Sequence, residues 1–312
     1  MHMPQERRLG RGLSDVSNLF LSEDEGEGRE SREQVGESDV GHAGGADDVR
    51  VLGVACAAEG IQKSFLTINL ALELAKLDRR VVIIDADPSA PSVGFLMGVP
   101  AGRVFDRLEH SDGSVGGRCL EGPLGVRVVL MGDDPTRIAT LASEGLIREA
   151  RGVAEDVAVV IINAPPVHRG AACGSWRLCT HLLVLTPPEI PGMMDAYLLL
   201  KAAALSRHDL AIGTVVTGAG TAVEGRAIYE KMASVAKRHL GLSLINYGFV
   251  FDDVRVYESV WRQEPVALSY TESTSARCIK EIAEALVGAS SETAGPSWED
   301  EDTDAGAMET QQ

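Results

Sequence analysis

The chain has 312 residues, of which 45% are hydrophobic, and this is enough for one folded domain of about 240 residues with additional segments at its ends. Its net charge of −17 is concentrated, because residues 21–48 hold ten acidic and two basic residues, and residues 289–312 hold seven acidic residues and no basic one. The remainder is close to neutral, so charge argues neither for nor against nucleic acid binding, and both acidic stretches are predicted to be solvated and disordered.

Residue patterns argue against membrane and secreted classes of protein. No stretch approaches the run of about 18 apolar residues that marks a membrane-spanning helix, and the N-terminal residues lack the apolar core of a secretory signal. The five cysteines are scattered and lack a CxxC pair, which indicates small core residues rather than a disulfide framework or a zinc site. We therefore expect a cytoplasmic protein without a membrane anchor.

Composition divides the chain into four segments. A short basic and apolar interaction peptide is predicted at 1–20, an acidic disordered linker at 21–49, a folded domain at 50–288 and an acidic disordered tail at 289–312. Within the peptide, Leu9, Leu13, Val16 and Phe20 recur every three or four residues beside three arginines, which predicts one apolar stripe on a helix.

In the folded domain, apolar β-branched runs alternate with amphipathic stretches. This alternation is typical of βαβ units, and strands that are apolar throughout indicate a parallel sheet covered by helices on both faces. The predicted fold is a single doubly wound, mostly parallel α/β domain. Strands are predicted at 51–56, 81–85, 126–131, 157–163, 182–186, 211–217 and 244–250, and helices at 63–77, 136–151, 191–206, 223–240, 254–262 and 273–287.

A candidate phosphate-binding loop follows the first strand. It contains Gly60, and Lys63 and Ser64 stand at the start of the next helix. In such a loop glycine lets backbone N–H groups surround a phosphate, lysine meets the β- and γ-phosphates, and a hydroxyl binds Mg²⁺. Lys63 and Ser64 could equally begin an ordinary helix without a ligand. The second strand ends in Asp85 and Asp87, which either serve this site or only cap the following turn.

The motifs that follow in the sequence carry a resemblance to a known family. Asp85-Ala-Asp87, the strand at 159–165 and the segment at 186–201 resemble the MinD/ParA superfamily of P-loop ATPases, which have a deviant Walker A motif. Residues 224–286 are most similar to flagellar-number regulators of the FlhG/FleN type. The resemblance covers nearly all of 50–288 and implies a P-loop NTPase fold.

The family resemblance also implies ligands and roles for the candidate site. ATP and Mg²⁺ would be the cofactors, with Gly60, Lys63 and Ser64 binding the nucleotide. Ser64 and Asp85 would hold the metal, and Asp87 would orient the attacking water as the catalytic residue.

Four residues of the loop depart from the family pattern. Ala58 stands where the family has a lysine that reaches the phosphate of a dimer partner, and Glu59 and Gln62 replace glycines. Phe65 replaces a threonine whose hydroxyl contacts the α-phosphate. Because phosphoryl transfer depends on positioning and charge neutralisation, these changes predict weak ATP binding and slow hydrolysis.

Two further departures lie outside the loop. Asn163 stands at the position of the Walker B aspartate, and Thr217 at that of an asparagine that reads the adenine edge. Asn163 gives up a carboxylate, so we interpret it as a hydrogen-bonded polar group at a strand end rather than a catalytic residue. His168 and His181 lack a matching ligand or nucleophile and are predicted to be structural.

The stretch Leu-Gly-Arg-Gly-Leu-Ser at 9–14 is similar to the N-terminal arm of ParB-type partition proteins, which engages ParA-type ATPases. This resemblance implies that Arg8, Leu9, Arg11 and Leu13 bind another protein, and the alternative is a chance match in a frayed end. The activating peptide of FlhG-like proteins has a different motif, DQAxxLR, which this chain lacks.

Two functions remain open from the sequence. The first is a pseudo-ATPase or weak ATP binder that acts as an adaptor in cell-pole, flagellar or chromosome positioning and is recruited to a pole by its partners. Its partner would be a ParA/MinD-type ATPase or a flagellar SRP-type GTPase, and the family resemblance also allows a homodimer. The second is an active switch that dimerises on ATP. An iron–sulfur carrier of the Mrp type is disfavoured because a paired CxxC is missing.

Overall fold

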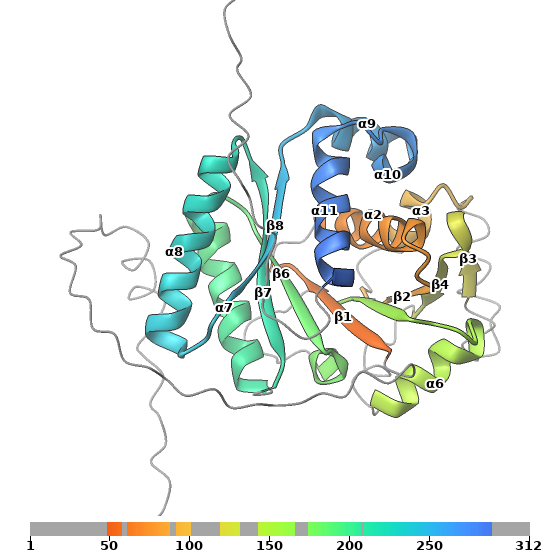
Figure 1. Ribbon diagram of the computed structural model, residues 1–312, viewed down its shortest axis with the longest axis horizontal. Coiled ribbons are helices and arrows are strands. Elements are labelled where there is room, and N and C mark those ends of the chain that lie inside the picture. The colour runs from red at the N-terminus through yellow and green to blue at the C-terminus, as the bar shows by residue number, and fades with distance from the viewer. Residues whose placement is uncertain are drawn as a thin grey trace, which may run out of the picture.

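A computed structural model describes residues 49–57, 61–87, 92–100, 119–131, 143–165, 174–206 and 209–288. Its eight-stranded sheet is flanked by helices on both faces (Figure 1). All strand pairs described are parallel except β3 with β4, and the spatial order is β3-β4-β2-β5-β1-β6-β7-β8. The strands are β1 (Arg50–Ala55), β2 (Val81–Asp85), β3 (Cys119–Glu121), β4 (Arg127–Leu130), β5 (Val159–Asn163), β6 (His181–Thr186), β7 (Ala211–Ala219) and β8 (Ile245–Phe251).

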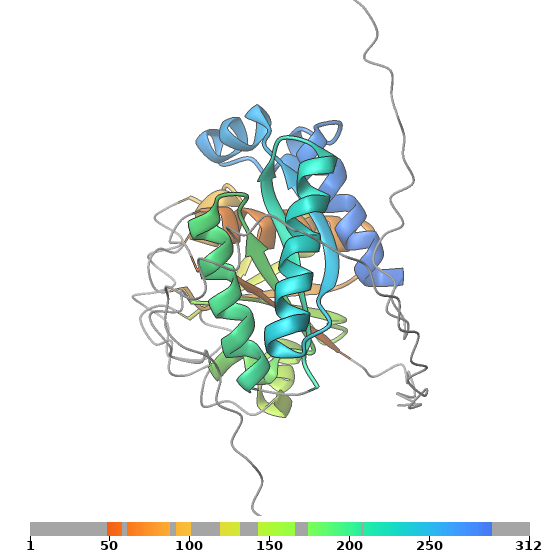
Figure 2. The same ribbon diagram turned by 90° about the vertical axis from the view of Figure 1, so that its left-hand side faces the viewer.

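The helices divide between the two faces. Figure 2 shows α7 and α8 side by side on one face, while Figure 1 shows α2 and α11 adjacent on the other. None of the helices within the described ranges is both long and apolar enough to span a membrane. The helices are α2 (Gln62–Lys76), α3 (Ser92–Leu96), α6 (Ser143–Val153), α7 (Ile190–Ser206), α8 (Ala222–Leu240), α9 (Val254–Arg262), α10 (Val266–Ser269) and α11 (Thr274–Gly288), with short 3-10 turns at Pro123–Gly125 and Gly174–Leu178.

The doubly wound, mostly parallel fold predicted from the sequence is confirmed, and every predicted strand is present to within two residues at its ends. The structure adds the short antiparallel β3 and the helices α3 and α10, which the sequence pattern did not indicate. The first seven residues of the helix predicted at 136–151 lie outside the described ranges, and α6 accounts for the rest.

Two hydrophobic clusters lie on opposite faces of the sheet. Alternate residues of β1 enter them in turn, because successive side chains of a strand point to opposite faces. Val51 and Ala55 join the cluster under α7 and α8, and Leu52 and Val54 join the cluster under α2 and α11. This is why the strand is apolar throughout.

Gly213 in β7 illustrates how closely the sheet is packed, and it provides a prediction. A Cβ atom added there would clash with the carbonyl oxygen of Ile245 and with the ring of Tyr247. We expect Gly213→Ala to lower the free energy of unfolding, measured by urea denaturation, by about 1–3 kcal/mol because a packed core resists added volume.

Gly152 in α6 provides the matched control. No described atom lies within 4 Å of a Cβ built at this position. Gly152→Ala should therefore stabilise the protein by about 0.5–1 kcal/mol through lost flexibility of the unfolded chain. Equal effects of the two substitutions would contradict the packing described for β7 and β8.

Candidate functional site

The candidate site lies at the carboxyl edge of the sheet. The neighbouring strands β2, β5 and β1 all end there, and α2 begins after the loop that follows β1. Asp85 and Asn163 are register partners at the ends of β2 and β5. Parallel pairing therefore brings together residues that lie 78 positions apart in the chain. Three residues predicted for this site, Ala58, Glu59 and Gly60, lie outside the described residues.

The side chain of Lys63 reaches from α2 to the ends of two strands. Its Nζ atom lies 2.6 Å from Oδ2 of Asp87 and also donates a hydrogen bond to the carbonyl oxygen of Ala164. Both side chains of the ion pair are buried. A buried ammonium depends on such partners because transfer of a charge out of water is costly. The positive charge predicted to meet a phosphate is thus neutralised by the carboxylate predicted to be catalytic.

A second set of contacts surrounds Asn163. Its amide nitrogen donates a hydrogen bond of 2.8 Å to Oδ1 of Asp85 and another of 3.3 Å to the hydroxyl oxygen of Ser64. The amide therefore links the two groups that the family resemblance assigns to Mg²⁺. Oδ2 of Asp85 and Oδ1 of Asn163 are buried and have no hydrogen-bond partner among the described residues.

Burial changes the acidity of Asp85, whose surface is only 3% exposed. Loss of hydration raises the pKa of its carboxyl from 3.8 to about 7, even though the hydrogen bond from Asn163 acts in the opposite direction. A large part of the Asp85 population is therefore neutral near pH 7.

These contacts bear on whether Mg²⁺ fits the residues present. Mg²⁺ prefers oxygen ligands in octahedral geometry, usually including carboxylates. Here an NH₂ group donates to both Ser64 and Asp85, and an amide stands in place of the second carboxylate. The oxygens that no described group binds are Oδ2 of Asp85 and Oδ1 of Asn163, one from a carboxyl and one from an amide. The described residues therefore offer Mg²⁺ one carboxylate fewer than the family pattern does.

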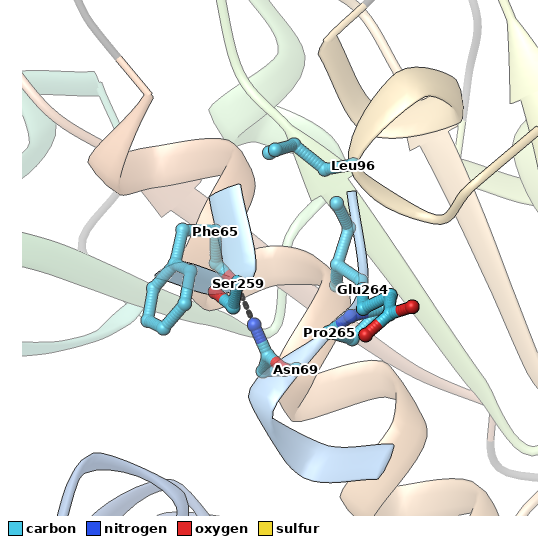
Figure 3. A pocket seen from close by; sticks show the side chains of 7 residues that line it. Phe65, Asn69, Leu96, Ser259, Glu264 and Pro265 are labelled. Carbon is cyan, nitrogen blue, oxygen red and sulfur yellow. Dashed lines mark hydrogen bonds between the residues drawn. The ribbon is translucent and has the colours of Figure 1, made fainter. Parts of the chain in front are cut away.

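Phe65 and Gln62 depart from the family pattern in different ways. Gln62 is the first residue of α2 and is exposed. Phe65 is buried with the apolar cluster under α2, where it lines a small pocket together with residues of α3 and of the segment from α9 to α10 (Figure 3). Its ring thus contributes to the packing between helices, which a threonine hydroxyl could not do.

The remaining predicted residues are separate from this cluster. Thr217 is buried near the end of β7, and its hydroxyl has no hydrogen-bond partner in the described part of the chain. His181 begins β6 at the opposite edge of the sheet, where burial, followed by the charge of Arg50, lowers its pKa to about 4. His168 and the peptide residues Arg8, Leu9, Arg11 and Leu13 lie outside the described residues.

Sequence reasoning missed the direct pairing of Lys63 with Asp87 and the part played by the Ala164 carbonyl. The loss of a carboxylate at Asn163 was the sequence signal for a changed site. Its two hydrogen bonds depend on strand order, which the sequence does not display.

Comparisons with known proteins agree with the fold. Residues 53–266 match the model of the CobQ/CobB/MinD/ParA nucleotide binding domain. The antiactivator FleN of Pseudomonas aeruginosa is 26% identical over 251 residues, which are 77% of this chain and 87% of FleN. The resemblance to MinD/ParA proteins, and among them to the FlhG/FleN type, is thereby confirmed.

Solved structures give the same fold. The MinC:MinD cell division complex of Aquifex aeolicus matches with a TM-score of 0.61 at 17% identity, covering 78% of this chain and 98% of the matched chain. MinD of Pyrococcus horikoshii, solved with Mg-ADP, matches with a TM-score of 0.59 at 16% identity, covering 77% and 96%. The family match spans more than half of the chain, and the chain belongs to the CobQ/CobB/MinD/ParA nucleotide binding domain family.

Proposed function

We propose that this chain is a regulatory protein that binds ATP weakly or not at all and works as an adaptor through contacts with other proteins. The observation that carries the proposal is that the donor groups of Lys63 and Asn163 already bind other residues of the site. Lys63 is paired with Asp87, and Asn163 links Ser64 to Asp85. A nucleotide would have to break these contacts before it gained its own.

The similarity to an antiactivator supports a regulatory role. We propose that the process is flagellar, cell-pole or chromosome positioning in the cytoplasm, with recruitment to a pole by a partner. A ParA/MinD-type ATPase or a flagellar SRP-type GTPase is the proposed partner. The existence of a MinC:MinD complex supports the idea that a protein of this fold acts through a bound partner.

The second candidate is an ATP-dependent switch that dimerises on ATP. It is favoured by the presence of Lys63 and Ser64 at the start of α2, the place at which the family binds phosphate. The similarity to MinD solved with Mg-ADP supports the same candidate. In this case the triphosphate must take Lys63 away from Asp87.

A titration of the full chain with ATP and Mg²⁺ separates the two candidates. For the adaptor we expect a Kd above about 0.1 mM, which corresponds to a binding free energy weaker than about −5.5 kcal/mol. We also expect the same weak binding for Lys63→Ala, since the lysine is already paired within the protein. Micromolar binding that Lys63→Ala abolishes, together with ATP-driven dimerisation, would establish the switch.

A combined variant tests whether reversing three of the departures from the family pattern gives measurable ATP hydrolysis. Ala58→Lys, Gln62→Gly and Asn163→Asp together restore the cross-dimer cation, the loop glycine and the second carboxylate. Since a single missing cation of this kind costs on the order of 10³-fold in rate, turnover should become measurable. Asn163→Ala is the matched control, because it breaks the same hydrogen bonds without adding a carboxylate.

A further inference from the structure

Helix α9 carries an apolar stripe that faces solvent. Val254, Tyr257 and Trp261 recur at spacings of three and four residues, so they lie on one side of the helix. Their surfaces are 65%, 66% and 89% exposed. Leu268 of the adjoining α10 is also exposed. Apolar residues grouped in this way, with a fully solvated tryptophan among them, are typical of an interaction site.

The helix is fixed at its beginning by a side chain that connects two elements. Oδ1 of Asp253 accepts a hydrogen bond of 2.9 Å from the backbone N–H of Arg255 and so caps α9. Its Oδ2 atom accepts from the backbone N–H and the hydroxyl of Ser275 in α11, at 3.1 and 3.0 Å. Capping of this kind stabilises a helix end and here also sets its position against α11.

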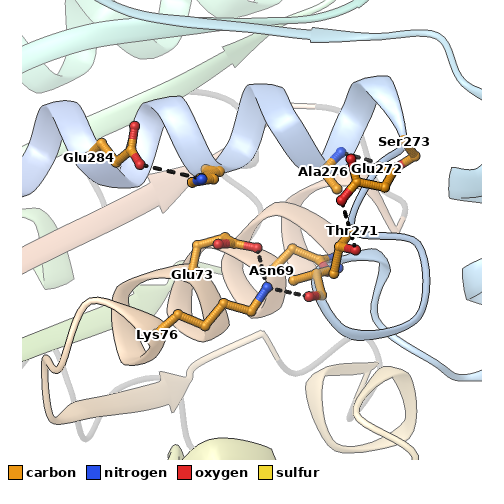
Figure 4. Close-up of polar contacts among 10 residues, drawn as sticks. Asn69, Glu73, Lys76, Thr271, Glu272, Ser273, Ala276 and Glu284 are labelled. Carbon is orange, nitrogen blue, oxygen red and sulfur yellow. Dashed lines mark hydrogen bonds and ion pairs between the residues drawn. The ribbon is translucent and has the colours of Figure 1, made fainter.

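The α10 segment is held in the same way by α2. Oδ1 of Asn69 accepts a hydrogen bond of 3.0 Å from the N–H of Ala267, and Lys76 donates to the carbonyl oxygen of that residue (Figure 4). The buried Glu73 lies 2.8 Å from Nζ of Lys76. With the backbone N–H and carbonyl groups of Ala267 both bound to α2, α10 is held in a fixed position against that helix.

The surroundings of the stripe are acidic. Residues 252–272, which include α9 and α10, contain five acidic and two basic residues, a net charge of −3. Glu264 lines the pocket beside Phe65 (Figure 3). On α9 itself Glu258 is paired with Arg255, and Arg262 is the last residue of the helix. A ligand for this surface should therefore combine an apolar stripe with positive charge.

We propose that residues 7–20 of this chain dock as a helix on the surface formed by Val254, Tyr257, Trp261 and Leu268. This segment has the required chemistry, because its pattern predicts an apolar stripe and it holds three arginines against one aspartate. The neighbouring residues 21–48 have a net charge of −8 and therefore lack the positive charge that the surface requires. The docked segment would cover the exposed tryptophan and hold its own partner-binding residues against α9.

The linker formed by residues 21–48 is long enough for the segment 7–20 to reach α9 in the same molecule. The described chain starts at Val49, at the amino end of β1, while α9 follows the carboxyl end of β8. The two points are therefore about one strand length, or 20 Å, apart along the strands, and three strand spacings, or about 14 Å, apart across the sheet. The 28 residues from 21 to 48 span about 30 Å as a flexible coil and about 90 Å when extended. The segment can therefore reach the surface within one molecule.

Hydrogen exchange of the full chain, without nucleotide, tests the proposal. In the variant Leu9→Asp/Leu13→Asp the amides of α9 should exchange about tenfold faster, given an effective concentration near 1 mM and a Kd near 0.1 mM for a tethered helix. Trp261→Ser should in turn speed exchange within residues 7–20. Leu205→Ser is the matched control, since Leu205 is 62% exposed but lies on α7.

Each outcome has a definite meaning. Reciprocal acceleration that does not depend on protein concentration supports docking within one molecule. Unchanged exchange of α9 in the double variant overturns the proposal, and so does protection that disappears on dilution, because the segment would then come from a second copy. The proposal does not rest on the nucleotide site, so strong ATP binding would overturn the proposed function and leave this inference intact.

Discussion

Replacement of Asp85 by asparagine is expected to stabilise the protein, and the gain should be about 3 kcal/mol larger at pH 8 than at pH 5. Burial raises the pKa of this carboxyl from 3.8 to about 7. Between these values the folded protein binds a proton that the unfolded chain has released, so stability falls as pH rises through the interval. The pH rises by about two units between pH 5 and the pKa of the folded state, and each unit lowers the free energy of unfolding by about 1.36 kcal/mol.

The sign of this pH dependence follows because burial disfavours the charged form of Asp85. The contribution of the neutral Asp85 is fully present below pH 3.8 and is lost as pH rises to about 7, where a buried carboxylate remains. Asparagine has nearly the same shape and does not ionise, so the variant avoids this loss. Comparing the stabilisation at pH 5 with that at pH 8 also cancels any effect of the substitution that is independent of pH.

Urea unfolding of both proteins at pH 5 and pH 8 measures the effect. Asp156→Asn serves as the control, because Asp156 is an exposed carboxylate paired with Arg80 on the surface. Its replacement should change stability by a similar small amount at both pH values. If Asp85→Asn showed no more pH dependence than this control, the burial and unmatched oxygen described for Asp85 would be wrong.

Replacement of Phe65 by threonine, the residue expected from the family, should lower the free energy of unfolding by about 3–4 kcal/mol. The ring is buried between α2, α3 and the segment from α9 to α10 (Figure 3). Threonine leaves a cavity there and also buries a hydroxyl. The variant should not gain ATP turnover, since Lys63 and Asn163 keep their contacts.

Chemical denaturation and an ATPase assay on the same preparation test both parts. Phe65→Leu is the matched variant and should cost about 1 kcal/mol, because it keeps most of the buried volume. A loss below 1 kcal/mol for threonine would mean that the ring does not support the helices. Restored ATP turnover would mean that the absence of a single hydroxyl had limited hydrolysis at the site.

Several features follow from local sequence alone. The apolar runs of β1 and β2 and the amphipathic pattern of α11 predicted these elements because side chains repeat every two residues in a strand and about every 3.6 in a helix. The loop between β1 and α2, together with Lys63 and Ser64 at the start of α2, predicted the place of the candidate site. The family motifs then indicated which residues to compare.

Other features were decided by tertiary structure. The three-residue strand β3 has too few residues to show a period, and its pairing with β4 stabilises it. The helix predicted at 254–262 is present, but only the packing of α10 and α11 against α2 determines that Trp261 faces solvent.

The sequence by itself determined the family and the type of fold and predicted the position of a phosphate-binding loop, because motifs and hydrophobic periods are local properties of the chain. It did not determine what the altered residues contact. The placement of β5 between β2 and β1 brings Asn163 against Asp85 and Ser64, and the same edge brings Asp87 to Lys63. These contacts join residues 24 to 99 positions apart, so they depend on strand order, and strand order is set by the packing of the whole domain.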